Sequence, residues 1–389
     1  MRFLIAPDSF KESLSAAEAA QLMREALAAV LPDAAFDLAP LADGGEGTAE
    51  CLCRAFGGVQ IPCTVTGPMG APIESGFVVH ERENSRRAVI ETAACCGLML
   101  IPPARRDPLR TTTRGVGEMM RAALQKGCRS LVLTLGGSGT NDGGIGMLQA
   151  LGAQILDENG SPVPEGGCGL EQVAAIDLAP CRALLQGVQI TLLCDVRCPL
   201  LGPVGATQMF GAQKGADTAL RARLEQGMAR YAAALNTAAG RDLAGQPGAG
   251  AAGGLGAALM ALGGPDTVRT RCGADYMMEA LDLEHRIAQS DVVIVGEGAI
   301  DAQSLEGKLP IAVAEKAKKL GKPVVAFVGM ENGEEEAFRR HGIEVVFCIL
   351  RRLAPLEETL QAARENLSCT VQNFARTMAI ATQLQGDKR

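Results

Sequence analysis

The apolar and polar positions of the chain alternate between short buried strands and amphipathic helices at both ends. Residues 2–7, RFLIAP, form an apolar run typical of a buried strand, and residues 15–31 carry an apolar stripe at helical spacing. Ser15 and Glu18 form a capping-box pattern at the start of this helix. The same alternation returns from DVVIVGEGAID at 291–301 to IEVVFCI at 343–349. It predicts a parallel sheet with helices on its faces.

The middle of the chain has a different pattern. Residues 61–80 predict two strands around a Gly-Pro turn, and therefore an antiparallel hairpin. Further strand patterns at 87–94, 130–135 and 188–196 accompany helical patterns at 113–127 and 219–240. We therefore expect an α/β fold, with a parallel Rossmann-like or flavodoxin-like sheet domain of residues 1–70 plus 290–389. A second, mixed α/β domain, residues 71–289, is inserted in it, and we expect the active-site cleft between the two domains.

The composition narrows the class of protein. The chain has 389 residues, of which 47% are hydrophobic and 21% charged, as in a globular protein. Its net charge of −7, its 3% aromatic residues and its lack of Trp argue against nucleic-acid binding. The N-terminal apolar run is too short for a signal peptide. The long uncharged stretch at 246–265 is too rich in glycine and alanine for a membrane span.

The thirteen cysteines are scattered along the chain, and no CxxC motif occurs. The three histidines lie far apart and near no cysteine pair, so a zinc site is not expected. These features predict reduced, mostly buried thiols in a cytoplasmic protein.

Five polar clusters flanked by glycine follow predicted strands or lie in glycine-rich turns. They cover residues 6–16, 41–48, 136–144, 194–200 and 296–308. Because ligands bind beyond the carboxyl ends of parallel strands, we expect the clusters to converge on one site. Their acidic residues are Asp8, Asp43, Glu46, Asp142, Asp195, Glu297 and Asp301. Their donors include Lys11, Lys308, Ser9, Ser138, Thr140, Asn141 and the amides of loop glycines such as Gly137. This mixture suits Mg²⁺ and phosphate together.

Each cluster also has a simpler structural interpretation. Asp8 and Ser9 could cap a turn before the first helix, and GGSGTND could be only a turn. Gly253 and Gly254 could serve close helix packing or could aim their amides at a ligand. The GxGxxD pattern at 296–301 has Asp301 where a dinucleotide-binding loop has glycine, which argues against that use.

Seven segments together resemble a known family. APDSFKESLSA, PLADGGEGT, GGSGTNDGG, CDV..PL, F..QKGA, GAAGGLGAAL and GEG.ID.QS..GK.P are similar to the signature segments of the type-1 glycerate kinases, in the family's order, from residue 5 to about 330. The resemblance implies a two-domain α/β kinase that uses ATP and Mg²⁺ to phosphorylate D-glycerate. In similar bacterial members the product is typically 2-phosphoglycerate. Five positions depart from the family pattern: Gly139, Arg197, Cys198, Ala212 and Ala299.

We therefore predict Asp195, Asp301 and Lys11 as catalytic residues. Asp195 and Asp301 hold Mg²⁺ or activate the attacking hydroxyl, and Lys11 offsets phosphate charge. The predicted substrate- and phosphate-binding residues are Asp8, Ser9, Asp43, Glu46, Gly137, Ser138, Thr140, Asn141, Asp142, Gly253, Gly254, Glu297, Gln303 and Lys308.

Three alternatives to this function stay open. The first is glycerate 3-kinase activity, or a kinase for a related small hydroxy acid. The second is a nicotinamide-dependent oxidoreductase, and the third is a non-catalytic sensor of hydroxy acids. We expect a monomer or a homodimer, with ATP and D-glycerate as small-molecule partners and no nucleic-acid or membrane partner.

Overall fold

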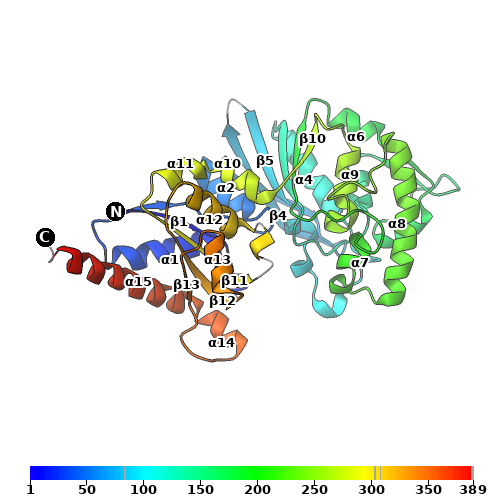
Figure 1. Cartoon of the computed structure of the whole chain (residues 1–389). Helices are drawn as coiled ribbons and strands as arrows, with labels where there is room; N and C mark the ends of the chain where they lie inside the picture. Colours follow the sequence, from blue (N-terminus) through cyan, green and yellow to red (C-terminus); the bar gives the residue numbers. More distant parts are fainter. Residues whose placement is uncertain (83–84, 302–303, 307, 387–389) are drawn as a thin grey trace. The chain divides into compact units, whose positions relative to one another are not determined.

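The computed structural model describes residues 1–82, 85–301, 304–306 and 308–386. The chain forms two compact units (Figure 1). Unit 1 comprises Met1–Asp43 and Ala274–Arg389, and unit 2 comprises Gly44–Gly273. Among the described residues, no helix has the length and apolar character that a membrane crossing requires.

Unit 1 is built on a parallel sheet of strand order β13-β12-β11-β1-β2. Its strands are β1 (Arg2–Pro7), β2 (Ala35–Leu38), β11 (Val292–Asp301), β12 (Val324–Asn332) and β13 (Val345–Cys348). Its helices are α1 (Ala16–Ala28), α10 (Gly273–Ala280), α11 (Leu283–Ala288), α12 (Leu309–Lys319), α13 (Glu335–Arg340), α14 (Leu356–Gln361) and α15 (Ala363–Gly386), with a 3₁₀ turn, η6 (Ser304–Glu306). Counted within the unit, the order is the 2-1-3-4-5 of flavodoxin-like folds, which confirms the predicted parallel α/β sheet.

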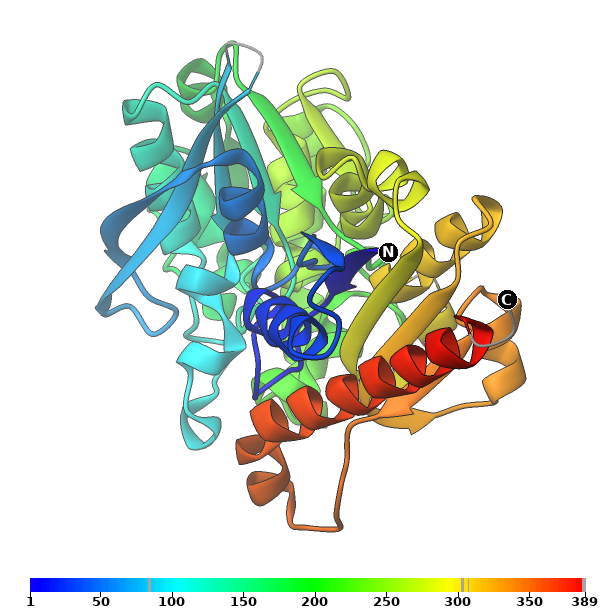
Figure 2. The ribbon, with the colours of Figure 1, turned by 90° about the vertical axis from the view of Figure 1, so that its left-hand side faces the viewer.

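Helices α1 and α15 run alongside each other over one face of this sheet (Figures 1 and 2). Met23 of α1 and Leu367 and Val371 of α15 are fully buried with Phe3 and Phe327 of the strands. The predicted capping box at the start of α1 is confirmed, because the Ser15 hydroxyl accepts from the backbone N–H of Glu18 while the Glu18 carboxylate accepts from that of Ser15.

Unit 2 contains a mixed sheet of strand order β10-β9-β6-β5-β4-β3. Its strands are β3 (Val59–Thr66), β4 (Pro72–Arg82), β5 (Ser85–Glu91), β6 (Ser130–Thr134), β9 (Gln189–Leu193) and β10 (Val268–Arg271), beside a separate pair of β7 (Gln154–Leu156) and β8 (Ala175–Asp177). Its helices are α2 (Thr48–Phe56), α3 (Ala93–Cys96), α4 (Arg114–Gln125), α5 (Ile145–Leu151), α6 (Ala179–Leu184), α7 (Ala206–Phe210), α8 (Thr218–Ala239) and α9 (Leu255–Ala261). β3 and β4 form the antiparallel hairpin that the sequence predicts.

The units divide at other positions than those expected from the sequence. We placed the first boundary at residue 70, but residues 44–70 belong to unit 2, because β3 pairs with β4 along its whole length. We placed the second at residue 289, but residues 274–289 belong to unit 1. There, Arg286 of α11 forms an ion pair with Asp37 of β2 at 2.6 Å.

All thirteen cysteines are free. The expectation that most are buried is too strong. The buried thiols are Cys51, Cys95, Cys96, Cys128 and Cys181, and Cys348 is exposed.

Candidate active site

The strand order of the unit 1 sheet reverses between β1 and β11. From this point the chain order runs in opposite directions, to β2 on one side and to β12 and β13 on the other. Ligands of open parallel sheets bind beyond the carboxyl ends of the strands at such a point. Asp8 directly follows β1, and its N–H donates to the Gly296 carbonyl at 2.8 Å, one residue before Glu297. The sheet therefore brings Asp8 close to Glu297 at this edge.

Asp8 is a carboxyl group that titrates near neutral pH. Burial and the nearby carboxylate of Asp43 raise the pKa of Asp8 from 3.8 to about 6. The N–H of Ser9, which donates to Asp8 Oδ1 at 2.5 Å, and the charge of Lys11 oppose this rise. The segments after β1 and β2 therefore form one charged cluster within unit 1.

Glu297 carries the second shifted carboxyl group of this cluster. Burial raises the pKa of Glu297 from 4.5 to about 7, Asp8 and Asp301 add to the rise, and Lys308 and Lys11 oppose it. The side chain is 7% exposed, and its Oε1 has no hydrogen-bond partner among the described residues. Two other carboxyl groups and two lysines thus act electrostatically on Glu297.

Asp301 is held at the end of β11 by the turn that follows it. Its Oδ1 accepts from the Ser304 N–H at 2.9 Å, and its own N–H donates to the Ser304 hydroxyl at 3.1 Å. The Lys308 ammonium lies 3.5 Å from the same hydroxyl, which places this lysine beside Asp301. Gln303, which we also expect in the site, lies outside the described residues.

Unit 2 also gathers polar residues at one edge of its sheet. β5, β6, β9 and β10 are parallel, so the segments that follow them emerge at the same edge. Gly44 and Gly136 make close backbone contacts there: a Cβ on Gly44 would lie 3.1 Å from the Gly273 Cα, and one on Gly136 3.0 Å from the Gly45 Cα. Glu46, in the same loop, is exposed.

Asp195 lies at this edge, just beyond β9. Its side chain is exposed, and its Oδ1 accepts from the Gly273 N–H at 2.7 Å. Asp195 and Asp301 offer the hard oxygen ligands that Mg²⁺ prefers. Among the described residues, no group of three or more His, Cys, Asp or Glu side chains is placed to hold a metal ion. Mg²⁺ that bridges a nucleotide needs only one or two carboxylates beside the phosphates, so either of these carboxylates, each within its own unit, suits such an ion.

The polar side chains of the glycine-rich loop, residues 136–144, point into unit 2. Ser138 is 7% exposed, and Thr140 and Asn141 are fully buried. Asn141 donates to the Thr207 hydroxyl of α7 at 3.1 Å. We expected these side chains to contact substrate, but in this structure most of them anchor the loop from within. The exposed part of the loop is the backbone of Gly137, which has a left-handed φ of +74°.

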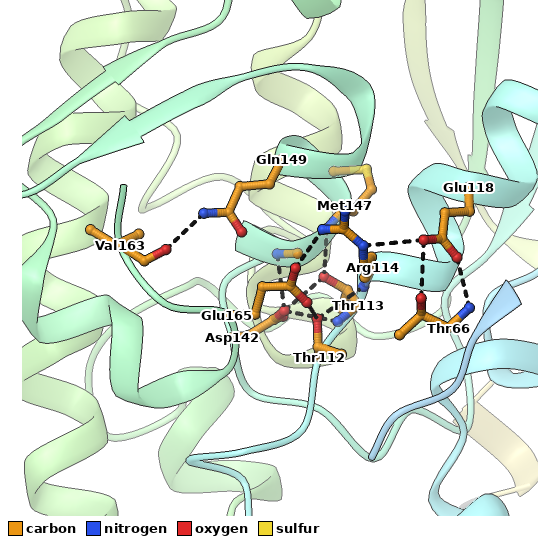
Figure 3. A network of polar contacts seen from close by, with 11 residues as sticks. Thr66, Thr112, Thr113, Arg114, Glu118, Asp142, Met147, Gln149, Val163 and Glu165 are labelled. Atoms are coloured by element: carbon orange, nitrogen blue, oxygen red, sulfur yellow. Dashed lines mark hydrogen bonds and ion pairs between the residues drawn. The ribbon is translucent and has the colours of Figure 1, made fainter. Parts of the chain in front are cut away.

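Asp142 is the strongest of these anchors (Figure 3). Its fully buried carboxylate accepts from the N–H and hydroxyl of Thr113 at 2.9 and 2.8 Å, and from the N–H groups of Gly144 and Gly146 at 3.0 and 3.3 Å. Burial raises the pKa of Asp142, and these donors oppose the rise. Its position favours a role in fixing the loop over the predicted contact with substrate.

The same network continues along the surface of α4 (Figure 3). Arg114 forms ion pairs with Glu118 at 3.1 Å and with Glu165, and Glu165 also accepts from the Thr112 hydroxyl at 2.9 Å. Glu118 in turn accepts from the N–H and hydroxyl of Thr66. Thr112 and Arg114, which flank the Thr113 that donates to Asp142, are therefore themselves held by Glu165 and Glu118.

Gly253 and Gly254 pack against the back of this loop. A Cβ on Gly253 would lie 2.1 Å from the Thr140 carbonyl oxygen, and one on Gly254 2.8 Å from the Gly143 Cα. Both glycines have left-handed φ angles and are buried. Of the two interpretations open at the sequence level, the geometry favours close packing.

Sequence reasoning missed three residues that hold the loop: Thr113, Thr207 and Lys214. Lys214 is 2% exposed, and its ammonium donates to the Ser138 hydroxyl and the Thr140 carbonyl. Two sequence signals were available. Lys214 lies in the segment F..QKGA that carries part of the family resemblance, and Thr113 stands at the start of the predicted helix 113–127. Neither pattern reveals that the side chain is buried.

Replacing Asp142 tests its anchoring role. Asp142→Asn puts an amide group among N–H and O–H donors, so we expect a loss of about 2–4 kcal/mol in the free energy of unfolding. Denaturant unfolding measures this loss. Asp217→Asn is the matched control, because Asp217 caps α8 and Asn caps a helix equally well. A loss below about 1 kcal/mol in Asp142→Asn would contradict the role.

The raised pKa of Glu297 predicts a pH dependence of stability. Between about pH 4.5 and 7, folded Glu297 retains a proton that the unfolded chain has lost, so the free energy of unfolding falls as pH rises through this window. Glu297→Gln removes the titration. Its stability relative to wild type should therefore rise from pH 4.5 to 7.5, by up to about 3 kcal/mol, in denaturant unfolding. A difference between the variant and wild type that stays constant with pH would refute the shift.

Comparisons with known proteins place these features in a family. A sequence model of the Glycerate kinase family matches residues 3–379. The chain is 43% identical to a glycerate kinase of Haemophilus influenzae, over 97% of this chain and 99% of the relative. It is 42% identical to the glycerate 2-kinase of Escherichia coli, over 99% and 100%. A crystal structure from Salmonella typhimurium LT2 assigned as glycerate kinase 2 is 42% identical, with a TM-score of 0.85 over 98% of this chain and 99% of that one. The chain therefore belongs to the glycerate kinase family.

Proposed function

We propose that this chain is an ATP-dependent kinase that phosphorylates D-glycerate at the 2-hydroxyl group, giving 2-phosphoglycerate and ADP. Membership of the glycerate kinase family over nearly the whole chain carries this proposal. The 42% identity to a relative named glycerate 2-kinase supports the position of the phosphoryl group.

The charge cluster of unit 1 supplies what phosphoryl transfer requires. This reaction depends mainly on positioning and on neutralising the charge of the transferred group. Lys11 and Lys308 lie beside the carboxyl groups of Glu297 and Asp301 at the strand-order reversal of the sheet. We assign the two lysines to the phosphate oxygens, where their charge stabilises the transition state.

In the proposed transfer, the 2-hydroxyl oxygen bonds to the γ-phosphorus of ATP while the bond from that phosphorus to the ADP oxygen breaks. The hydroxyl proton passes to a carboxylate, for which Asp195 and Asp301 are the candidates. In the alternative role, either carboxylate would hold Mg²⁺, which would neutralise phosphate charge. Asp8, Ser9, Asp43 and Glu46 remain proposed substrate-binding residues.

The location and the oligomeric state are further proposals. A cytoplasmic location agrees with thirteen free cysteines, because disulfides are rare in that compartment. A monomer or a homodimer remains our expectation.

Release of ADP tests the kinase proposal. We expect the protein to release ADP from Mg-ATP in the presence of D-glycerate, in a coupled spectrophotometric assay. The ³¹P NMR spectrum of the product then separates 2-phosphoglycerate from 3-phosphoglycerate. No turnover with Mg-ATP would reject the kinase, and tight NADH binding in a fluorescence titration would favour the oxidoreductase instead.

Two carboxylate variants test the assigned catalytic residues. Asp195→Asn and Asp301→Asn keep an oxygen for the Gly273 and Ser304 N–H groups but lose the negative charge. We expect each to lower kcat by about 100-fold or more, with an unchanged Tm. Asp217→Asn should retain the wild-type rate, and a wild-type rate in either test variant would refute that residue's assignment.

A further inference from the structure

Lys214 lies buried beneath the glycine-rich loop. It ends η4 (Ala212–Lys214), and Gly215 follows with a left-handed φ of +98°, which turns the chain away. The Lys214 Nζ donates to the Ser138 Oγ at 3.0 Å and to the Thr140 carbonyl oxygen at 2.7 Å. A lysine from a segment more than seventy residues further along the chain thus holds this loop.

No carboxylate neutralises this ammonium group by direct contact, as far as the described residues show. Asp142 is a carboxylate that acts electrostatically on Lys214, and it already accepts from Thr113, Gly144 and Gly146. A buried charge without a paired counter-charge is costly. The Lys214 ammonium group is therefore a positive charge behind the loop that no carboxylate of the described residues neutralises by direct contact.

Two polar side-chain atoms of the same loop lack hydrogen-bond partners among the described residues. The Thr140 Oγ1 and the Asn141 Oδ1 are buried, and neither has a hydrogen-bond partner among the described residues. Buried polar atoms without partners are uncommon in folded proteins and point to a constraint other than stability. Burying these two atoms without partners costs free energy, and the loop keeps its conformation despite this cost.

Ser138 connects the buried charge to the outer side of the loop. An ammonium group can only donate, so the Ser138 oxygen accepts from Lys214, and the Ser138 O–H remains a donor for another group. Ser138 is 7% exposed, while the side chains of Thr140, Asn141 and Asp142 are fully buried. Hydrogen bonds in such a chain strengthen one another, so Lys214 makes the Ser138 O–H a better donor.

We propose that Lys214 is a positioning residue that acts through Ser138 and turns the exposed side of the glycine-rich loop into a binding site for an anionic group of a substrate. In this site, the peptide dipole of the exposed Gly137 backbone acts beside the Ser138 O–H. The anion is a phosphate of the nucleotide or the carboxylate of the hydroxy acid. The inference rests on the proposed function and names how one loop serves it.

The ionisation of Lys214 gives this arrangement a measurable signature. Burial lowers the pKa of Lys214 from 10.5 to about 8, and Cys96, Asp142 and Cys198 oppose the fall. On the other elements packed against η4, the backbone of Arg106 approaches Gly215 and the stem of Arg221 approaches Gly211. The charge behind the loop should therefore disappear as pH rises from 7 to 9, and anion binding should weaken with it.

Three variants test the inference. Lys214→Gln removes the charge, Lys214→Arg retains it at pH 9, and Ser138→Ala removes the connecting hydroxyl. Lys126→Gln is the matched control, because Lys126 is an exposed lysine of the same unit. For each protein we measure Tm, kcat and the KM values for Mg-ATP and D-glycerate, at pH 7 and pH 9. Calorimetry with a non-hydrolysable ATP analogue and with D-glycerate gives the corresponding Kd values without turnover.

We expect Lys214→Gln to raise the KM and Kd of one of the two substrates about tenfold or more at pH 7, with a smaller change in kcat. In wild type the same Kd should rise between pH 7 and pH 9, and in Lys214→Arg it should not. The substrate that responds identifies the anion. Ser138→Ala should have a similar effect. A double variant that combines Ser138→Ala with Lys214→Gln should bind no more weakly than Lys214→Gln, because the two residues act through one hydrogen-bond chain.

The result that would overturn the inference is distinct from failure of the proposed function. If Ser138→Ala folds with the wild-type Tm and leaves both Kd values unchanged at both pH values, the loop does not act through Lys214 and Ser138. A lowered Tm in Lys214→Gln with both Kd values unchanged has the same meaning. Absence of ADP release in wild type rejects the kinase, while the calorimetric Kd values still decide the role of Lys214.

Discussion

Parallel strand pairing is the constraint on which both units depend. A parallel strand cannot follow its neighbour through a tight turn, so the chain must return through a long connection before the next strand is added. In unit 1, β1 pairs with β11, in a register that runs from Phe3 opposite Val292 to Pro7 opposite Gly296. The connection between β2 and β11 includes all of unit 2. Because parallel strands end at one edge, the same pairing brings the residues after β1 and β11 together.

The two units handle charge in opposite ways. At the edge of the unit 1 sheet, partly buried carboxyl groups and exposed lysines influence one another, so that Asp8 and Glu297 titrate near neutral pH. In unit 2 the charges of Asp142 and Lys214 are buried behind a loop whose exposed surface is mostly glycine backbone. One edge has groups that can gain or lose protons, and the other has the exposed Gly137 backbone beside the nearly buried Ser138 hydroxyl. Under the proposed function, the first edge would neutralise a phosphoryl group and the second would hold an anionic substrate in place.

Several features of the fold could be predicted because they depend on the local sequence pattern. The capping box of Ser15 and Glu18, the β3–β4 hairpin and the alternating strands and helices of unit 1 all follow from periodicity and turn residues. The unit boundaries did not follow from the same patterns. The expected boundary at residue 70 divides the predicted hairpin, whereas the pairing of residues 59–66 with β4 keeps both strands in unit 2. Nor does a motif say which way its side chains point. GGSGTND contains hydroxyl and amide groups that suit phosphate, yet the folded loop turns Thr140 and Asn141 inward.

Spacing and residue type are enough to establish the class of fold, the family and the polar clusters of the chain. The burial and the hydrogen-bond partners of each side chain depend on the tertiary structure. Asp142 and Asp195 both follow buried strands, but one is enclosed by four donors while the other is exposed beside Gly273. The sequence places Lys214 in the segment F..QKGA without indicating its burial, and in the fold this lysine lies buried under a loop. The physical reason is that burial, and with it the pKa and the hydrogen-bond partners of a group, depends on residues that are distant along the chain.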